Sequence, residues 1–500
     1  MAFSTGERVS LPHSNQKECD GIQLEHDKAA FGNVPASPAL EYPPEEEAKV
    51  VRKLDFRLLP IVFLLYSFSV LDRSNLGNAK LAGLEDDVDL RGDRYDWLGT
   101  VFYISYIVSQ PLQMGWKKFP PHIFCAAAVF LWGFVATIQV TVTSWGALMT
   151  CRWFLGTAEA MFGPGVPLYL SFFYPREKIG FRHGVFIAGA AAANVYGGIL
   201  AYALSHVHSR TLHPWKLLFI VEGVPTCLLA VYVFFFLPDS ISQCRFLSDR
   251  EKQVAAAANS RNQKGDADRK GGFRLSEVLE AFKDPKSYIP ALIYFSINVS
   301  FASLPLFVPT IISQMGTFNS QTANGLSAPP YALCFFVILL ATFLSDRYQV
   351  RGPFNAGIAL IAAAGFIMLA TTEDVAPRYA GVYLAVLIFT CIAVTLSWTA
   401  NLHATESKRA GGLTILQTIG QCGPLLGTNL FPTGEKPYYR KGMWISAGFC
   451  ILVAVLSASL SLLLIYENRE MERKGLIARK GEQLPEGEDC HDPRYFRNIW

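Results

Sequence analysis

Residues 216–237 have the sequence KLLFIVEGVPTCLLAVYVFFFL, and residues 287–312 have the sequence SYIPALIYFSINVSFASLPLFVPTII. Each run is long enough to cross the hydrocarbon core of a bilayer, which takes about 20 mostly apolar residues in a helix. The segment between them, 238–286, is too polar to cross, and its centre NQKGD (262–266) has the composition of a loop. Two apolar runs divided by a charged linker predict an integral membrane protein.

The composition agrees with a membrane location. The chain has 500 residues, of which 51% are hydrophobic and 17% charged, whereas soluble domains carry about 25% charged residues. The charges concentrate in 1–57, 238–287 and 467–500. A net charge of +3, with no basic stripe between aromatic residues, does not suggest a nucleic-acid partner. The cysteines are scattered singly, so no disulfide or metal framework is predicted.

Twelve apolar segments have the length of a membrane span, six before the linker and six after it. They lie at 57–78, 96–116, 121–143, 146–171, 183–205, 216–237, 287–312, 325–345, 354–371, 378–400, 411–431 and 442–466. We therefore predict an all-α membrane protein with twelve transmembrane helices in two six-helix bundles, 57–237 and 287–466. The flanks of the linker, around 251–258 and 275–282, are expected to form short amphipathic helices.

The remaining segments are predicted to be a disordered N-terminal tail, 1–56, the linker, 238–286, and a C-terminal tail, 467–500. Basic residues cluster before the first span, in the linker and after the last span, so both tails and the linker are assigned to the cytosol. The two halves also share local features. Charged loops follow the fourth and tenth spans, and glycines recur in the fifth and eleventh spans, which favours two related halves.

Ionisable residues within the spans give the sharpest indication of function, because each costs several kcal/mol in hydrocarbon unless it is paired or faces water. Asp72 and Arg73 lie late in the first span, and Arg152 and Glu159 lie in the fourth. Residues 152 and 159 are two turns apart on one helical face. Asp72 and Arg73 are consecutive, so they cannot both face the same partner.

These four residues suggest a proton relay. A carboxylate beside an arginine stays ionised, whereas in an apolar setting it takes a proton. An arginine released from its carboxylate is then available for an anionic substrate. We assign proton coupling to Asp72, Glu159 and Arg152, and substrate binding to Arg73. A structural ion-pair network without transport chemistry is the alternative. Glu222, before Pro225 in the sixth span, is expected to have a structural role.

Two further groups of residues carry predictions. Asp346, Arg347 and Arg351 follow the eighth span and are expected to gate the cavity through charge pairs and helix-dipole contacts. Polar and aromatic residues in the middle of spans are expected to line a binding cavity, and packing between helices is the alternative for each. The residues predicted to bind substrate besides Arg73 are Tyr106, Asn194, Trp398 and Gln417.

The motifs together resemble those of fungal members of the anion:cation symporter family, the allantoate-permease-like branch of the major facilitator superfamily. The resemblance covers about residues 50–475. It is carried by LDRSNLGNA (71–79), by Arg152 and Glu159, by Trp215 with Glu222-Gly223, and by SDR (345–347). It implies the major facilitator fold, proton-binding acids at Asp72 and Glu159, and an arginine that holds the substrate carboxylate. The loop 113–118 lacks the acidic part of the superfamily signature.

The expected function is therefore proton-coupled uptake of a small organic anion, such as a vitamin, ureide or sugar acid, by alternating access. The alternatives are a proton-antiport exporter of a metabolite or drug and a transporter-like nutrient sensor. No Walker loop, nucleotide fingerprint or metal cluster occurs, so no cofactor, no metal and no enzyme activity are predicted. The expected partners are the anion, protons and the bilayer, with no obligate protein partner. The expected location is the plasma membrane, with both termini cytosolic.

Overall fold

A computed structural model describes residues 42–175, 178–205, 213–260, 275–316, 318–402 and 406–474. The chain forms two compact units, Met1–Pro44 and Glu45–Trp500. The first lies almost wholly outside the described residues, and everything below concerns the second. The predicted tails at 1–41 and 475–500, the linker centre at 261–274, and residues 176–177 and 403–405 of the repeated loops also lie outside them.

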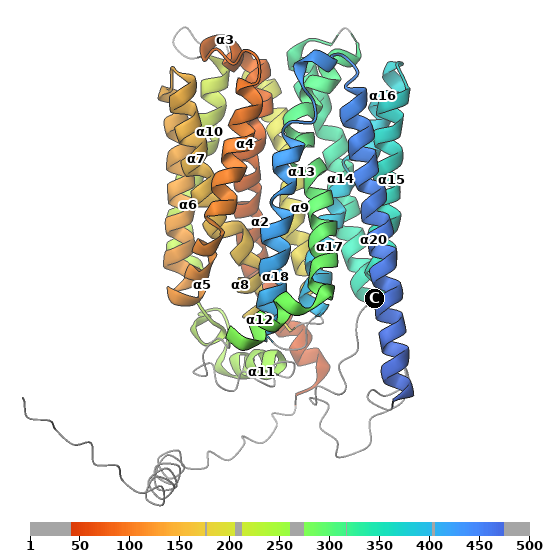
Figure 1. Ribbon diagram of the computed structural model, residues 1–500. Helices are drawn as coiled ribbons and strands as arrows, with labels where there is room; N and C mark the ends of the chain where they lie inside the picture. The colour runs from red at the N-terminus through yellow and green to blue at the C-terminus, as the bar shows by residue number, and fades with distance from the viewer. Residues whose placement is uncertain are drawn as a thin grey trace, which may run out of the picture. The chain divides into compact units, whose positions relative to one another are not determined.

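In the part of the chain that the structure describes, all regular elements are helices (Figure 1). The helices before the linker are α2 (Pro44–Ala79), α3 (Glu85–Asp87), α4 (Arg94–Val108), α5 (Gly115–Lys118), α6 (Pro121–Ile138), α7 (Trp145–Phe162), α8 (Val166–Ser171), α9 (Ile179–Ser205) and α10 (Pro214–Phe236). The linker forms α11 (Asp249–Ser260) and α12 (Leu275–Lys283). The later helices are α13 (Tyr288–Met315), α14 (Ser320–Tyr348), α15 (Gly352–Thr371), α16 (Val375–Ala385), α17 (Ile388–Leu402), α18 (Glu406–Gly420), α19 (Gly423–Gly427) and α20 (Arg440–Arg473).

We call α2–α10 the first half and α13–α20 the second half. The end of the bundle at which α11 and α12 lie is the linker end, and the opposite end, with α3, is the far end (Figure 1). The short helices α11 and α12 confirm that the flanks of the linker are helical.

Nine helices among the described residues are long and apolar enough to cross a membrane, which confirms an all-α membrane fold. The predicted spans 96–116, 146–171 and 411–431 are broken helices instead. The breaks fall at the 3₁₀ segments Gln110–Met114 and Gly163–Gly165 and at the turn before α19. Each break lies beside a proline, Pro111, Pro164 or Pro424, which lacks the N–H that a continuous helix needs. The count of twelve spans stays a prediction.

The boundary of the predicted N-terminal tail is wrong, because α2 begins at Pro44 and residues 44–56 are helical. Three glutamates in the first turn favour a helix start, since negative charge stabilises a helix N-terminus. The segment is also tied to other elements by ion pairs. Glu47 pairs with Lys178 at 2.6 Å and Asp55 with Arg182 at 2.5 Å. At the other end of the chain, α20 continues to Arg473, past the predicted tail boundary at 467.

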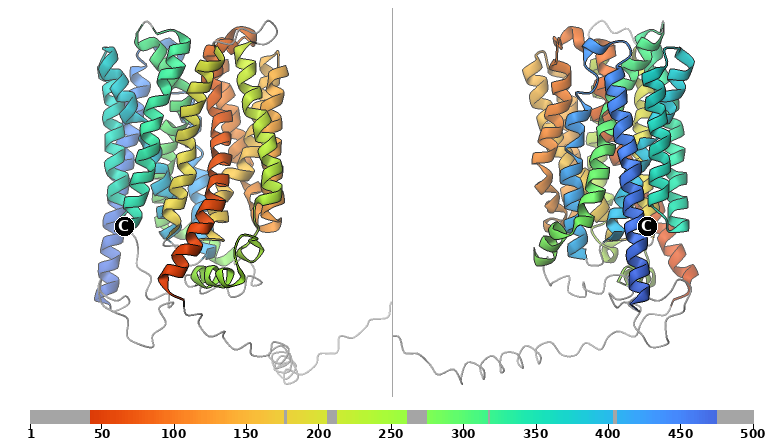
Figure 2. Two further views of the ribbon diagram at one scale, coloured as in Figure 1. Left: turned by 180° about the vertical axis from the view of Figure 1, so that it is seen from behind. Right: turned by 45° about the vertical axis from the view of Figure 1, so that its right-hand side comes forward.

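The two halves meet along α9, which packs against α14 and α17 of the second half. Seen from behind, α9 lies between α2 and α14 (Figure 2). At the far end, α2 and α13 approach so closely that a Cβ on Gly77 would lie 2.8 Å from the carbonyl oxygens of Pro305 and Leu306. Only glycine fits there, so this contact brings the Asp72–Arg73 segment next to the second half.

Candidate functional site

The four charged residues predicted within the spans divide into two groups. Arg73 Nη2 pairs with Glu159 Oε2 at 2.5 Å, and Ser69 Oγ donates to the same carboxylate oxygen at 2.7 Å. The guanidinium also lies over the rings of Phe102 and Tyr106, 5.4 and 5.7 Å from their centroids. Arg73 is thus held by one carboxylate and two aromatic faces.

Asp72 and Arg152 form the second group. Arg152 Nη1 donates to the backbone oxygen of Asp72 at 3.1 Å, not to its carboxylate. Neither carboxylate oxygen of Asp72 has a hydrogen-bond partner among the described residues. Asp72 thus does not share the partner of Arg73, as expected because consecutive side chains on a helix point about 100° apart. Glu222 of α10 joins this second group through its electrostatic interaction with Asp72 and Arg152.

A central cavity lies between the halves. Arg73, Tyr106 and Gln417, three of the residues predicted to bind substrate, line it together. Other lining residues, from both halves, are Tyr66, Tyr103, Tyr294, Asn298 and Gln421. Its free volume is about 20 Å³, which is room for about one water molecule. The cavity is therefore contracted in this structure.

Two of the predicted binding residues lie elsewhere. Trp398 is fully buried in an apolar cluster with Leu402, Leu460 and Leu464, between α17 and α20. The amide of Asn194 donates back to Ala190 O at 2.8 Å within α9. Neither residue lines the central cavity. The sequence identified them as polar or aromatic groups in a span, but the rotation of each helix turns them away from the cavity.

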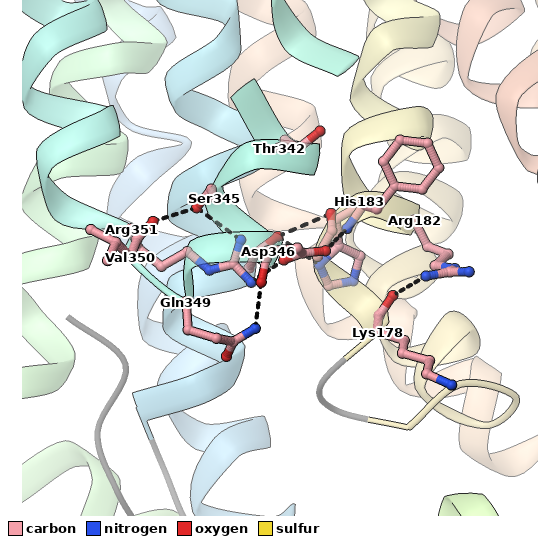
Figure 3. Close-up of polar contacts among 12 residues, drawn as sticks. Lys178, Arg182, His183, Thr342, Ser345, Asp346, Gln349, Val350 and Arg351 are labelled. Atoms are coloured by element: carbon pink, nitrogen blue, oxygen red, sulfur yellow. Dashed lines mark hydrogen bonds and ion pairs between the residues drawn. The ribbon is translucent and has the colours of Figure 1, made fainter. Parts of the chain in front are cut away.

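The linker end is closed by Asp346 of α14 (Figure 3). One of its carboxylate oxygens accepts the backbone N–H of Phe181 at 2.5 Å. Phe181 is the third residue of α9, a position whose N–H has no acceptor within the helix. The other oxygen pairs with Arg351, which also donates to Ser345 Oγ at 3.0 Å. Asp346 of the second half thus caps a helix of the first half.

The predicted gating residue Arg347 does not take part in this contact. Its side chain is exposed, and it makes no ion pair or hydrogen bond within the described ranges. A second contact between the halves lies nearby, where Ser397 Oγ is 3.5 Å from Nδ1 of the buried His183.

The far end is closed by uncharged groups. Thr100 and Thr428 share a hydrogen bond of 3.0 Å between α4 and the segment after α19. Tyr95 Oη donates to Leu306 O at 3.4 Å, next to the Gly77 contact. Both ends are thus closed over a contracted cavity, which is the geometry of an occluded state.

Ser69 belongs to this candidate site, and the sequence prediction missed it. It lies four residues before Arg73, one helical turn away, and its hydroxyl bonds Glu159 and accepts from Arg73 at 3.0 Å. The i, i+4 spacing was the available signal. Phe181 gave no signal at all, because its contribution is a backbone N–H.

Comparisons with known proteins agree with this geometry. The family model described as Major Facilitator Superfamily matches residues 62–428. An uncharacterized transporter of Schizosaccharomyces pombe is 31% identical over 89% of this chain and 92% of its own length. The high-affinity nicotinic acid transporter of Saccharomyces cerevisiae is 29% identical over 89% of this chain and 83% of its own length.

Solved structures show the same fold. The proton:xylose symporter XylE superimposes with a TM-score of 0.65, at 15% identity, over 82% of this chain and 96% of the XylE chain. The matching family model, the transporter relatives and the fold lead to one conclusion: the chain belongs to the Major Facilitator Superfamily and is an integral membrane transporter of that type.

Proposed function

We propose that this transporter takes up a small organic anion together with protons by alternating access. The observation that carries the proposal is the Arg73–Glu159 ion pair, in which Arg73 lines the central cavity and Glu159 is fully buried. Arg73 is the cation that lines this cavity, and in the occluded state its charge is already matched by a carboxylate.

The pair links anion binding to proton binding. An anion that enters the cavity must compete with Glu159 for Arg73. Protonation of Glu159 removes that competitor, because a neutral carboxyl no longer forms the charge-assisted bond. The buried site then holds a neutral acid and a guanidinium that is free to bind the anion. Proton and anion therefore favour each other's binding, which is the requirement for symport.

The cavity walls favour a small carboxylate with a flat body. Arg73 offers planar donors that match a carboxylate. Tyr66, Tyr103, Tyr106 and Tyr294 offer aromatic faces, while Gln417 offers an amide. The relative named as a nicotinic acid transporter is similar along most of this chain. Nicotinate is therefore the first compound to test, ahead of ureides and sugar acids.

The closures of the two ends would alternate around this cavity. We propose that the two six-helix bundles, 57–237 and 287–466, rock against each other. In this motion the linker end opens when the Asp346–Phe181 contact breaks. The far end opens when the contacts of Gly77 and Thr100 break. The basic residues around the tails and linker support a cytosolic linker end, in a plasma-membrane protein with cytosolic termini.

Uptake by the purified chain in proteoliposomes tests the proposal. Labelled nicotinate and a panel of other carboxylates are offered with an inward proton gradient, without a gradient and with an outward gradient. We expect accumulation of at least one carboxylate with the inward gradient only. Accumulation that ignores the gradient would refute symport, and accumulation under the outward gradient would identify a proton-antiport carrier instead.

Two variants test the role of the ion pair. Glu159→Gln should abolish gradient-driven accumulation but keep exchange of internal for external anion, because Arg73 is then permanently available. Arg73→Gln should weaken anion binding about 10- to 100-fold, the value of one hydrogen bond to a charged group. Arg347→Gln, an exposed arginine away from the cavity, is the matched control and should transport normally. Normal accumulation by Glu159→Gln would remove the basis of the proposal.

A further inference from the structure

Three ionisable side chains are buried beside the Arg73–Glu159 pair. Asp72 of α2 is 0% exposed, and Arg152 of α7 and Glu222 of α10 are each 1% exposed. Because all three are buried, their charged atoms are shielded from bulk water. Two of the three are acids and one is a base.

The packing of α10 directs Glu222 into the bundle. On the neighbouring residue, Gly223, a Cβ would lie 2.7 Å from the backbone N of Thr137 and 2.9 Å from Gly133 O, so this face of α10 is pressed against α6. The adjacent Glu222 consequently points away from α6 and is buried inside the bundle, within range of an electrostatic interaction with Asp72 and Arg152.

The hydrogen bonds of this cluster are incomplete. Both oxygens of Asp72 and both oxygens of Glu222 lack a hydrogen-bond partner among the described residues. Arg152 uses only Nη1, on the Asp72 backbone oxygen, and its Nε and Nη2 are also without partners there. A fixed structural ion pair would bind the carboxylates directly, because an unpaired buried charge costs several kcal/mol.

Other titratable groups surround the cluster. Those that interact with Asp72 are Glu159 of α7, Arg73 of α2, Tyr196 of α9 and Cys227 of α10. Those that interact with Arg152 are Tyr95 of α4 and, on its own helix, Glu159 and Cys151. Arg73 and Glu159 already neutralise each other as an ion pair. The tyrosines and the cysteines are uncharged at neutral pH. The charge balance of the cluster therefore depends on Asp72, Glu222 and Arg152.

With all three ionised, the cluster would carry one net negative charge in a dry interior. A buried carboxylate without a partner is so costly that it takes a proton instead. We propose that Asp72 and Glu222 share one resident proton and together form a second proton site, in which Glu222 is a coupling residue. This inference deepens the proposed function and rests on it only for the coupling step.

Arg152 connects the second proton site to the substrate. Besides facing Asp72, it lines the cavity that adjoins the central one, together with Arg73 and Tyr103. When Arg152 moves toward an anion there, the two carboxyls lose the cation that balances their charge, and the remaining carboxylate takes up a proton from water. When the anion leaves and Arg152 returns, that proton is released. One proton thus accompanies each negative charge that Arg152 binds.

Infrared spectroscopy of the full chain in lipid vesicles tests the shared proton directly, since a protonated buried carboxyl has its own C=O stretching band. At neutral pH the wild-type protein should show this band. In Asp72→Asn and in Glu222→Gln the remaining carboxyl is balanced by Arg152, so each single variant should lose the band. Glu85→Gln, an exposed glutamate at the far end, and Glu159→Gln should both retain it.

Several outcomes would overturn the inference. Absence of the band in the wild type would mean that no proton is resident. If the band persists in Asp72→Asn, Glu222 is a permanently neutral structural acid. If it persists in Glu222→Gln, Asp72 holds the proton alone. Thermal unfolding of each variant shows whether it is folded, so the loss of a band in a folded variant is specific.

Transport by the same variants separates this inference from the proposed function. In Glu222→Gln the ionised Asp72 holds Arg152, so proton-driven uptake should slow by about tenfold, within the range of coupling between charged groups of one network. If the wild type shows no proton-driven uptake but the bands behave as expected, the symport proposal fails and the proton site stands. If uptake is proton-driven but the band persists in either single variant, only the shared site fails.

Discussion

Replacement of Asp346 by alanine is expected to loosen the linker end. The carboxylate of Asp346 makes two contacts with different fates. Its pair with Arg351 lies within the second half and is kept when the end opens. Its hydrogen bond from the Phe181 N–H crosses between the halves and is lost on opening. Only the second contact therefore favours the closed state over the open state.

The size of the effect follows from that contact. A hydrogen bond to a charged group contributes about 1.5–3 kcal/mol, and a negative charge at a helix N-terminus adds about 0.3–1 kcal/mol. Because the two overlap in one interaction, we expect a loss of about 2–3 kcal/mol, or a shift of about 30- to 150-fold toward the open linker end. Asp346→Asn keeps an acceptor but loses the charge, and should produce about half of this change in free energy.

Hydrogen exchange of the backbone amides at Ile179–Phe186 measures the effect, because these amides exchange when the first turns of α9 become accessible. Exchange there should accelerate in the order wild type, Asp346→Asn, Asp346→Ala, while the amides at the far end keep their rates. Arg347→Gln, the exposed neighbour, is the control and should match the wild type. Equal exchange in Asp346→Ala and wild type would refute the role of Asp346 as a cap between the halves.

Two further predictions concern stability. Trp398→Ala should lower the free energy of unfolding by about 3–5 kcal/mol through the cavity it leaves, without changing the KM for the anion. Gln417→Ala should change the KM and leave the stability unchanged. A raised KM in Trp398→Ala would show that Trp398 belongs to the binding site. Burial alone would raise the pKa of Asp284, but the backbone N–H of Lys286 and the ammonium of Lys408 outweigh it and hold that pKa below its ordinary value. A carboxyl of lowered pKa stabilises the fold above its unfolded pKa of about 4 and loses that contribution as pH falls through the folded pKa. Thermal unfolding in detergent should therefore show a weaker loss of stability between neutral and acidic pH in Lys408→Met than in wild type, and parallel curves would exclude this contribution.

Features that depend on composition along the chain could be predicted from the sequence. Length and hydropathy located the apolar spans, and the polar linker divided them. The start of α2 was misplaced, because its first turns are polar and are stabilised by partners such as Lys178 and Arg182, far away in the sequence. Hydropathy does not register contacts of that kind.

The sequence predicts which charged residues belong to the candidate site, but not how they pair. A charge within a span is visible in the sequence, so Asp72, Arg73, Arg152 and Glu159 were all identified. Which charge meets which depends on the rotation of each helix about its axis. That rotation pairs Arg73 with Glu159 and leaves Arg152 on a backbone carbonyl. The rotation of α17 likewise directs the side chain of Trp398 into the apolar cluster and away from the cavity.

The two ends of the bundle are closed by different kinds of contact between the halves, and these contacts differ in their response to dissolved ions. The far end closes through a glycine packed on carbonyls and through hydroxyl groups, all uncharged. The linker end closes through a carboxylate, and ion pairs such as Asp55–Arg182 surround it. Dissolved ions screen charges but act little on neutral contacts. The salt concentration on the linker side therefore acts on the contact that closes that end, whereas the uncharged contacts that close the far end respond less to the salt on their side.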